Sequence, residues 1–221
     1  MSEMPKAFHL TPQIQRYVVD HSAPIDEVQK SLIAETEALG FIAIMQISPE
    51  QGAFMEQIAR LIGAKRIIEV GTFTGYSALC LARALPPGGK LLCCDISEEW
   101  TSIGRRYWEQ AGLGERIELR IAPAAETLAA LPADPVWDLA FIDADKGGYL
   151  TYYEEILKRL RPNGVILVDN VLWMGTVADP SMEGEDVVAI RAFNNFVAKD
   201  PRVEAVMLTI GDGLSLLRKK S

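Results

Sequence analysis

Short apolar runs that alternate with longer segments of helical character dominate the sequence from Arg66 to Val168. The runs show little internal alternation of apolar and polar residues, which is typical of strands buried on both faces of a parallel sheet. The expected strands are Arg66–Val70, Lys90–Asp95, Ile117–Ile121, Leu139–Asp143 and Val165–Val168. The expected helices between them are Ser77–Ala84, Glu98–Ala111, Ala124–Leu131 and Tyr149–Leu160. The pattern predicts an α/β fold in which helices cover both faces of a parallel sheet.

Three helices are expected before the first strand, namely Thr11–His21, Asp26–Leu39 and a third from Ser48 to Ile62. The third helix is expected to have Ser48 as its N-cap and Pro49 at its first position, with Gln51 completing a capping box. The segment Phe41–Ile47 joins these helices to the α/β part of the chain.

The C-terminal part of the chain changes pattern. A last helix, Glu185–Ala198, precedes two further strands, Val203–Ile210 and Leu214–Arg218. The sequence Gly211-Asp212-Gly213 between these strands predicts a hairpin turn, so the sheet is expected to end in an antiparallel pair. The length of 221 residues suits one domain, with a helical extension over 1–64 and an α/β core over 65–221.

Composition excludes several classes of function. The formal net charge is −8 and no basic cluster is present, so the chain is a poor candidate for binding nucleic acid. No apolar run approaches the roughly 20 residues that cross a bilayer. Met1–Lys6 lacks the apolar stretch of a signal peptide, and Cys80, Cys93 and Cys94 lack metal-binding spacing. We expect a cytoplasmic protein with buried, reduced cysteines and no membrane partner.

The segment Ile67–Ser77 predicts a strand, a tight glycine turn and the start of a helix. Gly71 permits a sharp turn and a close approach of a ligand, since it has no Cβ. Glu69 is the unusual residue, because a carboxylate at the end of a buried strand is costly without a partner. A nucleoside cofactor that carries a positive charge would supply one. The Gly71-x-x-x-Gly75 spacing is not the dinucleotide fingerprint, and an ordinary strand–turn–helix connection is the alternative interpretation.

Acidic residues follow four of the five expected parallel strands, namely Glu69, Asp95, Asp143 and Asp169. In parallel sheets, ligands bind at the carboxyl ends of the strands. Asp95 ends the second strand, roughly 20 residues beyond the glycine turn, where Rossmann-like folds hold ribose hydroxyls. Helix capping is the alternative explanation of such acids, although these follow apolar strands directly. The arrangement favours a shared site for a ligand and a metal.

Asp143, Asp169 and Asn170 offer only oxygen atoms as metal ligands. The two histidines, His9 and His21, lie in the N-terminal extension. An oxygen-only site suits Mg²⁺ or Ca²⁺, with waters completing the coordination shell. Adjacent residues of a straight strand point to opposite faces, so Asp169 and Asn170 share one ion only if the chain leaves the strand there. The alternative for Asn170 is a turn residue that bonds its own backbone.

Lys146 lies three residues beyond Asp143, in the sequence Asp143-Ala144-Asp145-Lys146. A dication beside a lysine favours the neutral amine, which can then take a proton from a bound hydroxyl group. This makes Lys146 a candidate general base. The alternative is a cluster of charges at the start of a helix, with Asp145 as the cap.

Four motifs, in this order, resemble the cation-dependent O-methyltransferases of the caffeoyl-CoA and catechol type, which are class I enzymes that use S-adenosylmethionine. The motifs are Ile68–Ser77, Phe141–Lys146, Asp169–Trp173 and Ile210–Leu214. The resemblance extends from about Thr11 to the end of the chain. It implies a Rossmann-like three-layer sandwich with a mostly parallel seven-stranded sheet, and a homodimer.

The resemblance also implies roles for individual residues. The cofactor-binding residues that it implies are Met45, Ile47, Glu69, Gly71, Thr72, Ser77, Asp95, Ala124 and Asp143. The implied metal ligands are Asp143, Asp169 and Asn170, which would bind Mg²⁺ or alternatively Ca²⁺ or Mn²⁺. Lys146 falls on the position of the base, and Asp143 is the second implied catalytic residue. The implied substrate contacts are Asp143, Lys146, Asn170 and Trp173, with a core or interface position as the alternative for Trp173.

The chain departs from the family pattern at two places. Ala122-Pro123-Ala124 stands where the family has Gly-Pro-Ala, next to the adenine. Met174 stands where the plant enzymes have Asn, next to the substrate, which argues against carrying caffeoyl-CoA over as the physiological acceptor. The predicted activity is therefore metal-dependent methyl transfer to a hydroxyl of a phenolic vicinal diol. The alternatives are a catalytically silent protein that binds S-adenosylmethionine and an NAD-dependent dehydrogenase.

Overall fold

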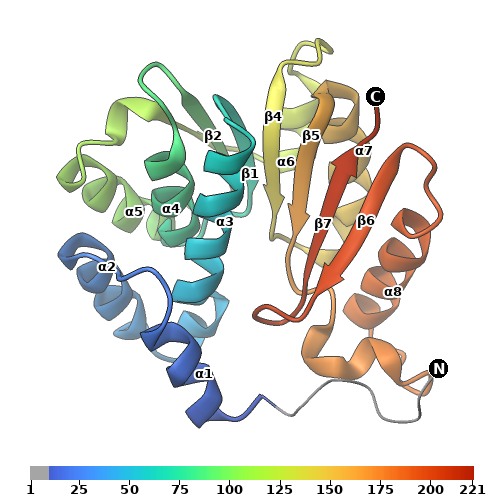
Figure 1. The fold of residues 1–221 in the computed structure, drawn as a ribbon, viewed down its shortest axis with the longest axis horizontal. Coiled ribbons are helices and arrows are strands. Elements are labelled where there is room, and N and C mark those ends of the chain that lie inside the picture. The colour runs from blue at the N-terminus through green and yellow to red at the C-terminus, as the bar shows by residue number, and fades with distance from the viewer. Residues whose placement is uncertain (1–9) are drawn as a thin grey trace.

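The computed structural model describes residues 10–221, so the expectations for Met1–Lys6 and His9 lie outside the described residues. Within that range the strands form one seven-stranded sheet (Figure 1). The strands are β1 (Arg66–Val70), β2 (Lys90–Asp95), β3 (Ile117–Ile121), β4 (Trp137–Ile142), β5 (Leu160–Val168), β6 (Val203–Leu208) and β7 (Leu214–Lys219).

The strand order is β3-β2-β1-β4-β5-β7-β6, with β1 to β5 parallel and β7 antiparallel to both β5 and β6. The order reverses between β1 and β4, which is where ligands bind in open α/β sheets. The predicted mostly parallel seven-stranded sheet with a C-terminal antiparallel pair is confirmed, and so is the Rossmann-like fold.

The α-helices are α1 (Pro12–Asp20), α2 (Glu27–Glu37), α3 (Pro49–Leu61), α4 (Tyr76–Ala84), α5 (Glu98–Gln110), α6 (Ala124–Ala129), α7 (Tyr149–Arg159) and α8 (Glu185–Val197). The 3-10 helices are η1 (Gly40–Met45), η2 (Gly114–Arg116), η3 (Lys146–Gly148) and η4 (Trp173–Ala178). The helices lie on both sides of the sheet, so the fold has three layers (Figure 1).

The core has two halves because successive strand residues point to opposite faces of the sheet. Ile67 of β1 packs with α2, α3, α4 and α5 on one face. Its neighbour Ile68 packs with α6, α7 and α8 on the other. Both residues are fully buried, which agrees with the expectation of strands covered on both faces.

The expected capping box at the start of α3 is wrong. Pro49 is the first residue of the helix as expected, but the Ser48 side chain makes no capping hydrogen bond. The Gln51 side chain instead donates to Asp169 Oδ2 at 2.8 Å. A bond to a buried carboxylate is stronger than one to a backbone amide, which accounts for the outcome. Most of the join Phe41–Ile47 forms η1.

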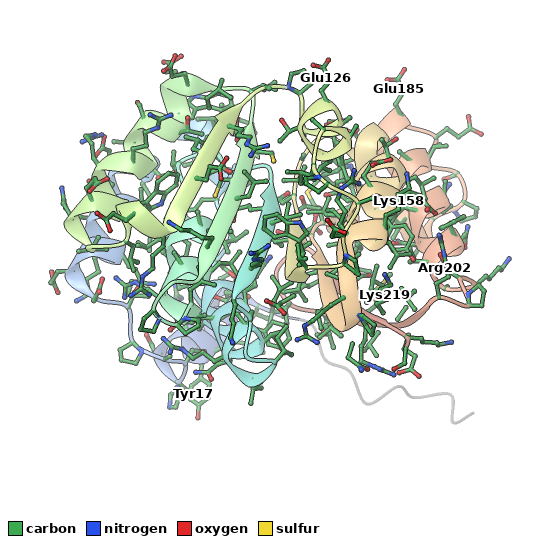
Figure 2. All side chains as sticks on the ribbon, turned by 90° about the horizontal axis from the view of Figure 1, so that it is seen from above. Tyr17, Glu126, Lys158, Glu185, Arg202 and Lys219 are labelled. Carbon is green, nitrogen blue, oxygen red and sulfur yellow. The ribbon has the colours of Figure 1, made fainter. Side chains whose placement is uncertain are left out.

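The outer surface of the N-terminal helices holds the only histidine within residues 10–221. The His21 ring stacks on Tyr17 at a centroid distance of 3.8 Å, and its Nδ1 lies 2.8 Å from the Tyr17 carbonyl oxygen. Tyr17 projects at the periphery of the molecule (Figure 2). His21 is the C-cap residue of α1, and these contacts with Tyr17 lie within the N-terminal extension. None of the helices in the described range combines the length and apolar character needed to span a membrane.

Candidate functional site

Gly71 begins the loop between β1 and α4, at the carboxyl edge of the sheet. Its amide donates to the Cys94 carbonyl at 2.9 Å, and its φ of +87° is in the region that favours glycine. A Cβ at this position would overlap the carbonyl oxygen of Asp143. Residue 71 therefore has to be a glycine because of the Asp143 backbone at the end of β4, whether or not a ligand is bound.

Asp95, at the end of β2, holds the same loop. Its Oδ2 accepts from the amides of Thr72 at 2.8 Å and Phe73 at 2.9 Å, and its Oδ1 accepts from Ser97 at 2.8 Å. A carboxylate has about four acceptor positions, so three of them are used by the protein and one remains for a ligand hydroxyl. Asp95 is therefore both a part of the loop and a candidate ribose ligand.

Glu69 is a buried carboxyl group with few hydrogen-bond partners. It is fully buried, and among the described residues its Oε2 has no hydrogen-bond partner. Its Oε1 lies 3.6 Å from Cys93 Sγ, which is a weak donor. Burial raises the pKa of Glu69 to about 8, an effect that the neighbouring Ser77 hydroxyl opposes. The buried Thr72 Oγ1 also has no partner within residues 10–221, so the two orphaned oxygens fit a ligand with ammonium donors.

The remaining candidate cofactor residues surround this loop in different ways. Ser77 is buried near the start of α4, and Ala124 is the buried first residue of α6. The Ala122 amide donates to the Asp95 carbonyl at 2.9 Å, which brings the start of α6 beside Asp95. Met45 is exposed at the end of η1, whereas the Ile47 side chain packs in the core. Ile47 can therefore contact a cofactor mainly through its backbone.

Asp143 and Asp169 lie side by side at the carboxyl ends of β4 and β5. The Asp143 amide donates to the Val70 carbonyl at 2.8 Å, and the Asp169 amide donates to the Ile142 carbonyl at 3.0 Å. Asn170 has a φ of +53°, so the chain leaves the strand direction at that residue. This meets the condition under which Asp169 and Asn170 can face one ion.

Lys146, in η3, is buried among these candidate ligands. Its Nζ donates to Asn170 Oδ1 at 2.6 Å and to Asp143 Oδ1 at 3.3 Å. It also donates to the Tyr149 hydroxyl at 2.7 Å, and that hydroxyl donates to the Asp169 carbonyl at 3.0 Å. The Asn170 side chain therefore faces Lys146, which disfavours the interpretation of Asn170 as a self-bonded turn residue.

The electrostatics of the two carboxylates favour a bound cation. Burial raises the pKa of Asp169 to about 7, and the nearby charge of Asp143 adds to this effect. Burial also raises the pKa of Asp143, while Lys146 opposes the shift. Residues 10–221 contain no cluster of three or more His, Cys, Asp or Glu side chains arranged for an ion. Two carboxylates and the Asn170 amide nevertheless fit a hard dication that keeps several waters.

Trp173 lies beside Lys146, and Met174 follows it in the same exposed loop. Both have a positive φ, 45° and 53°, and Gly175 follows with 82°. The Trp173 ring centroid lies 5.4 Å from Lys146 Nζ, and the Met174 side chain is 80% exposed. Trp173 is half-buried, so the interpretation of Trp173 as a core residue does not hold.

Four residues of the site were not found from the sequence: Gln51, Tyr149, Arg191 and Asp212. Asp212 lies in the β6–β7 turn, and its Oδ1 accepts from the Met174 amide at 2.5 Å. Arg191 of α8 donates to the carbonyls of Val177 at 3.1 Å and Asp179 at 2.8 Å, which holds the far end of the same loop. Asp212 could have been found from the sequence, because it lies inside the motif Ile210–Leu214. No sequence pattern points to Arg191.

A polar cavity of about 480 Å³ lies elsewhere, between the N-terminal helices and the ends of α4 and α5. Its four charged side chains are already paired, Arg83 with Asp26 and Arg60 with Glu56. The cavity therefore offers no free charge to a ligand, and it is not a competing candidate for the active site.

Comparison with known proteins agrees with this geometry. Residues 19–220 match the model of the family described as O-methyltransferase. A relative in Dictyostelium discoideum, "Probable caffeoyl-CoA O-methyltransferase 1", is 41% identical over 210 residues, covering 93% of this chain and 91% of the relative.

Two solved structures are similar over nearly the whole chain. The O-methyltransferase from Bacillus cereus in complex with SAH has a TM-score of 0.86 and 35% identity, covering 94% of this chain and 97% of that one. The O-methyltransferase TomG from Streptomyces achromogenes, in complex with SAM, has a TM-score of 0.87 and 29% identity, covering 95% and 96%.

Proposed function

The chain belongs to the O-methyltransferase family and is a methyltransferase of the caffeoyl-CoA type that uses S-adenosylmethionine, and from this premise we propose that it methylates catechol-type small molecules with the help of a divalent cation. The acceptor would be a phenolic compound with two adjacent hydroxyl groups. The 221 residues would act as one methyltransferase domain.

One observation carries the proposal. Lys146 Nζ contacts both Asp143 Oδ1 and Asn170 Oδ1, and Asp169 lies beside Asp143 at the same edge of the sheet. Candidate oxygen ligands for a dication and a candidate base are thus close together at this edge of the sheet. The loop that carries Glu69 and Gly71 borders them, because the Gly71 Cα packs against the Asp143 backbone.

S-adenosylmethionine would bind along the loop after β1. Glu69 and Thr72, with their orphaned oxygens, would accept hydrogen bonds from the methionine ammonium. Asp95 would use its free acceptor position for a ribose hydroxyl. Ala124 would border the adenine, and the η1 segment with Met45 and Ile47 would border the methionine end.

Asp143, Asp169 and Asn170 would hold the cation, with Mg²⁺ as the first choice and Ca²⁺ or Mn²⁺ as alternatives. When bound, the cation would lower the pKa of a hydroxyl that it coordinates and would fix the position of two adjacent hydroxyls. The Lys146 amine would accept the proton that the acceptor hydroxyl releases. Its contacts to Tyr149 and Asn170 hold Nζ beside the candidate cation ligands, which supports this role.

Positioning is expected to supply most of the rate acceleration. The acceptor oxygen is anionic and the sulfonium is cationic, so the two charges neutralise each other during methyl transfer. Strong stabilisation of either charge before transfer would slow the reaction, and holding the two atoms in line becomes the main contribution. Trp173, whose ring faces Lys146, would form an aromatic wall for the acceptor ring.

The chain is proposed to act as a homodimer in the cytoplasm, without nucleic-acid or membrane partners. The net charge of −8 supports the absence of a nucleic-acid partner. Sedimentation velocity tests the assembly directly, since a homodimer has twice the mass of the chain. A single species with the mass of one chain would remove the homodimer from the proposal.

The test of the function is transfer of a labelled methyl group from S-adenosylmethionine to caffeic acid, caffeoyl-CoA, catecholamines and flavonoids with a vicinal diol. Each acceptor is tested with Mg²⁺ and with EDTA. We expect label only on vicinal diols and only with the ion. The Asp169→Asn variant should lose the activity, whereas the variant of an exposed acid, Asp134→Asn, should keep it.

The two parts of the proposal fail separately. Full turnover in EDTA, with metal-free protein verified, would remove the cation and leave the methyltransferase. No label on any diol, with cofactor binding demonstrated, would favour a different acceptor or a silent binding protein. The dehydrogenase alternative has no support from the family to which the chain belongs.

A further inference from the structure

Gln51 lies in the first turn of α3, and it contacts a different candidate cation ligand from those that Lys146 contacts. Its side chain is 2% exposed, and its Nε2 donates to Asp169 Oδ2 at 2.8 Å. The two residues are 118 positions apart in the sequence. The bond therefore links the N-terminal helices to the end of β5, where the candidate cation ligands lie.

The β6–β7 turn leaves room for Gln51. A Cβ on Gly211 would overlap Gln51 Oε1, so the glycine at that position makes space for the amide group. The place of the Gln51 side chain is thus fixed from two sides, by Asp169 on its donor end and by the Gly211 backbone on its acceptor end. Two independent segments of the chain constrain one side chain, which is typical of a group whose orientation matters.

The hydrogen bonds of Asp169 define how its carboxylate can meet an ion. Its Oδ1 accepts from the Asn170 amide at 2.7 Å and its Oδ2 accepts from Gln51. With one lone pair of each oxygen committed, rotation of the carboxylate is restricted and the remaining lone pairs have a fixed direction. Gln51 is neutral, so it fixes that direction without adding charge to the pair Asp143 and Asp169.

We propose that Gln51 is a positioning residue for the cation centre, because it orients Asp169 for coordination through a hydrogen bond to its second oxygen. The proposal rests on the proposed function, since it requires that Asp169 binds a divalent cation. Gln51 itself touches neither the acceptor nor the reacting methyl group. It acts through Asp169, and its removal leaves Asp143, Asn170 and Lys146 in place.

The test measures cation binding rather than turnover. Mn²⁺ is titrated into the protein and free Mn²⁺ is followed by electron paramagnetic resonance. Gln51→Met keeps the length of the side chain and removes the donor. Since partners of metal ligands typically contribute 10- to 100-fold in affinity, we expect the Mn²⁺ dissociation constant to rise by about 10-fold or more. Affinity for S-adenosylmethionine should change by less than about two-fold.

Gln29→Met is the matched control. Gln29 is also a buried glutamine of the N-terminal helices, 6% exposed, but it donates to the Tyr76 hydroxyl at 3.4 Å and forms no hydrogen bond to a candidate cation ligand. It should lower the melting temperature and leave the Mn²⁺ dissociation constant unchanged. If Gln51→Met does not fold, Gln51→Asn retains the amide on a shorter side chain and should show the same loss of Mn²⁺ affinity.

Gly211→Ala tests the second constraint. The added Cβ should displace Gln51 and weaken Mn²⁺ binding, whereas the same change in a Gln51→Ala background should weaken it no further. The cost of placing an alanine at this positive φ, by contrast, should appear in the melting temperature of both variants.

The outcomes separate this inference from the function on which it rests. Wild-type protein that binds no Mn²⁺ would overturn both. Tight binding by wild type and equally tight binding by Gln51→Met would overturn the role of Gln51 and leave the cation-dependent function intact. Loss of affinity in Gln29→Met equal to that in Gln51→Met would also overturn it, because the effect would then be general destabilisation.

Discussion

Individual residues at the cofactor side of the site stabilise the fold in addition to being candidate ligands of the cofactor. Asp95 shows this most clearly, because three of its acceptor positions bind the amides of Thr72, Phe73 and Ser97. Its replacement therefore loosens the loop and removes the ribose ligand together. The candidate cation ligands lie on other strands, so the two kinds of binding can be separated.

Asp95→Ala is expected to weaken S-adenosylmethionine binding by about 10-fold or more, since it removes charge-assisted hydrogen bonds. Cation binding should be largely retained, because Asp143, Asp169 and Asn170 do not contact Asp95. Calorimetry with each ligand in turn measures both quantities. Unchanged affinity for S-adenosylmethionine would contradict the ribose role.

Glu69 gives a prediction about pH. Its pKa is about 8 in the folded, cofactor-free protein, against an ordinary value of 4.5, because of its burial. Between these values the unfolded chain loses the proton while the folded protein keeps it, so stability falls as pH rises from about 4.5 to about 8. The Glu69→Gln variant has no carboxyl group at this position, so it should not lose stability in this way as pH rises. Its melting temperature should exceed that of wild type by about 3 °C or more at pH 8 and by little at pH 5.

The control for Glu69 is an exposed glutamate. Glu126 lies at the surface at the start of α6 (Figure 2), and Glu126→Gln should show no pH-dependent difference. Glu69→Gln should also weaken S-adenosylmethionine binding, since the ammonium would lose its anionic partner. A difference in melting temperature that stays constant from pH 5 to pH 8 would count against the buried carboxyl as its origin.

Lys146 should affect the chemical step more than binding. General bases contribute about 10²- to 10⁴-fold to rate, so Lys146→Met is expected to lower kcat by at least about 100-fold. The affinity for S-adenosylmethionine should stay within a few-fold of wild type. Lys158→Met, in an exposed pair with Glu155, is the control that should leave kcat unchanged. Wild-type turnover of Lys146→Met at neutral pH would exclude Lys146 as the base.

At the residue level, the position of a side chain could be predicted where it follows directly from its strand. Asp143 and Asp169 extend parallel strands, and parallel strands place their ends together. Prediction failed for Gln51, because Ser-x-x-Gln before a helix satisfies the pattern of a capping box and its partner is 118 residues away. Local pattern cannot show which of two hydrogen bonds a side chain makes when one of them is tertiary.

At the scale of elements, the junction of β1, α4 and β4 depends on one glycine. Gly71 has a φ of +87° and leaves no space for a Cβ beside the Asp143 carbonyl. A side chain there would push the loop away from the end of β4. The cofactor loop and the candidate cation ligand Asp143 would then lose their common position.

Gly71→Ala is expected to cost at least about 2 kcal/mol more free energy of unfolding than Gly88→Ala. Gly88 has a similar φ of +78°, with no atom within 4 Å of an added Cβ, so its replacement costs only the strain of about 1–2 kcal/mol. The excess at Gly71 measures the clash. Urea unfolding of both variants gives the comparison, and equal losses would show that the loop relaxes freely.

Element boundaries were predictable wherever apolar residues mark them. The expected bounds of β1, β2 and β3 agree with the structure. β5 begins earlier than expected, at Leu160, because its first residues pair with Trp137 at an irregular point of the ladder. The sequence Pro162-Asn163-Gly164 has the composition of a turn, and Asn163 has a φ of +60°, so the pairing with β4 is interrupted between Leu160 and Val165.

At the scale of the whole molecule, the candidate site draws on segments that are distant in sequence. Gln51 comes from the N-terminal helices, Asp143 and Asp169 from the parallel strands, and Asp212 from the antiparallel hairpin. The sheet order was inferable from general rules of α/β topology and from the family resemblance. The contacts that the N-terminal helices and the hairpin make with the site were not, because no local pattern encodes them.

A site assembled from such separate segments exists only in the folded chain, so cation binding should stabilise the whole fold. At an Mg²⁺ concentration about 100 times its dissociation constant, binding adds about 2.7 kcal/mol to the free energy of unfolding. For a chain of 221 residues this corresponds to a rise in melting temperature of about 5–10 °C. Asp169→Asn should lose this rise while retaining the rise produced by S-adenosylmethionine, because Glu69 and Asp95 are unaltered. Differential scanning calorimetry with each ligand measures both effects, and an Mg²⁺-dependent rise that survives in Asp169→Asn would place the ion elsewhere in the molecule.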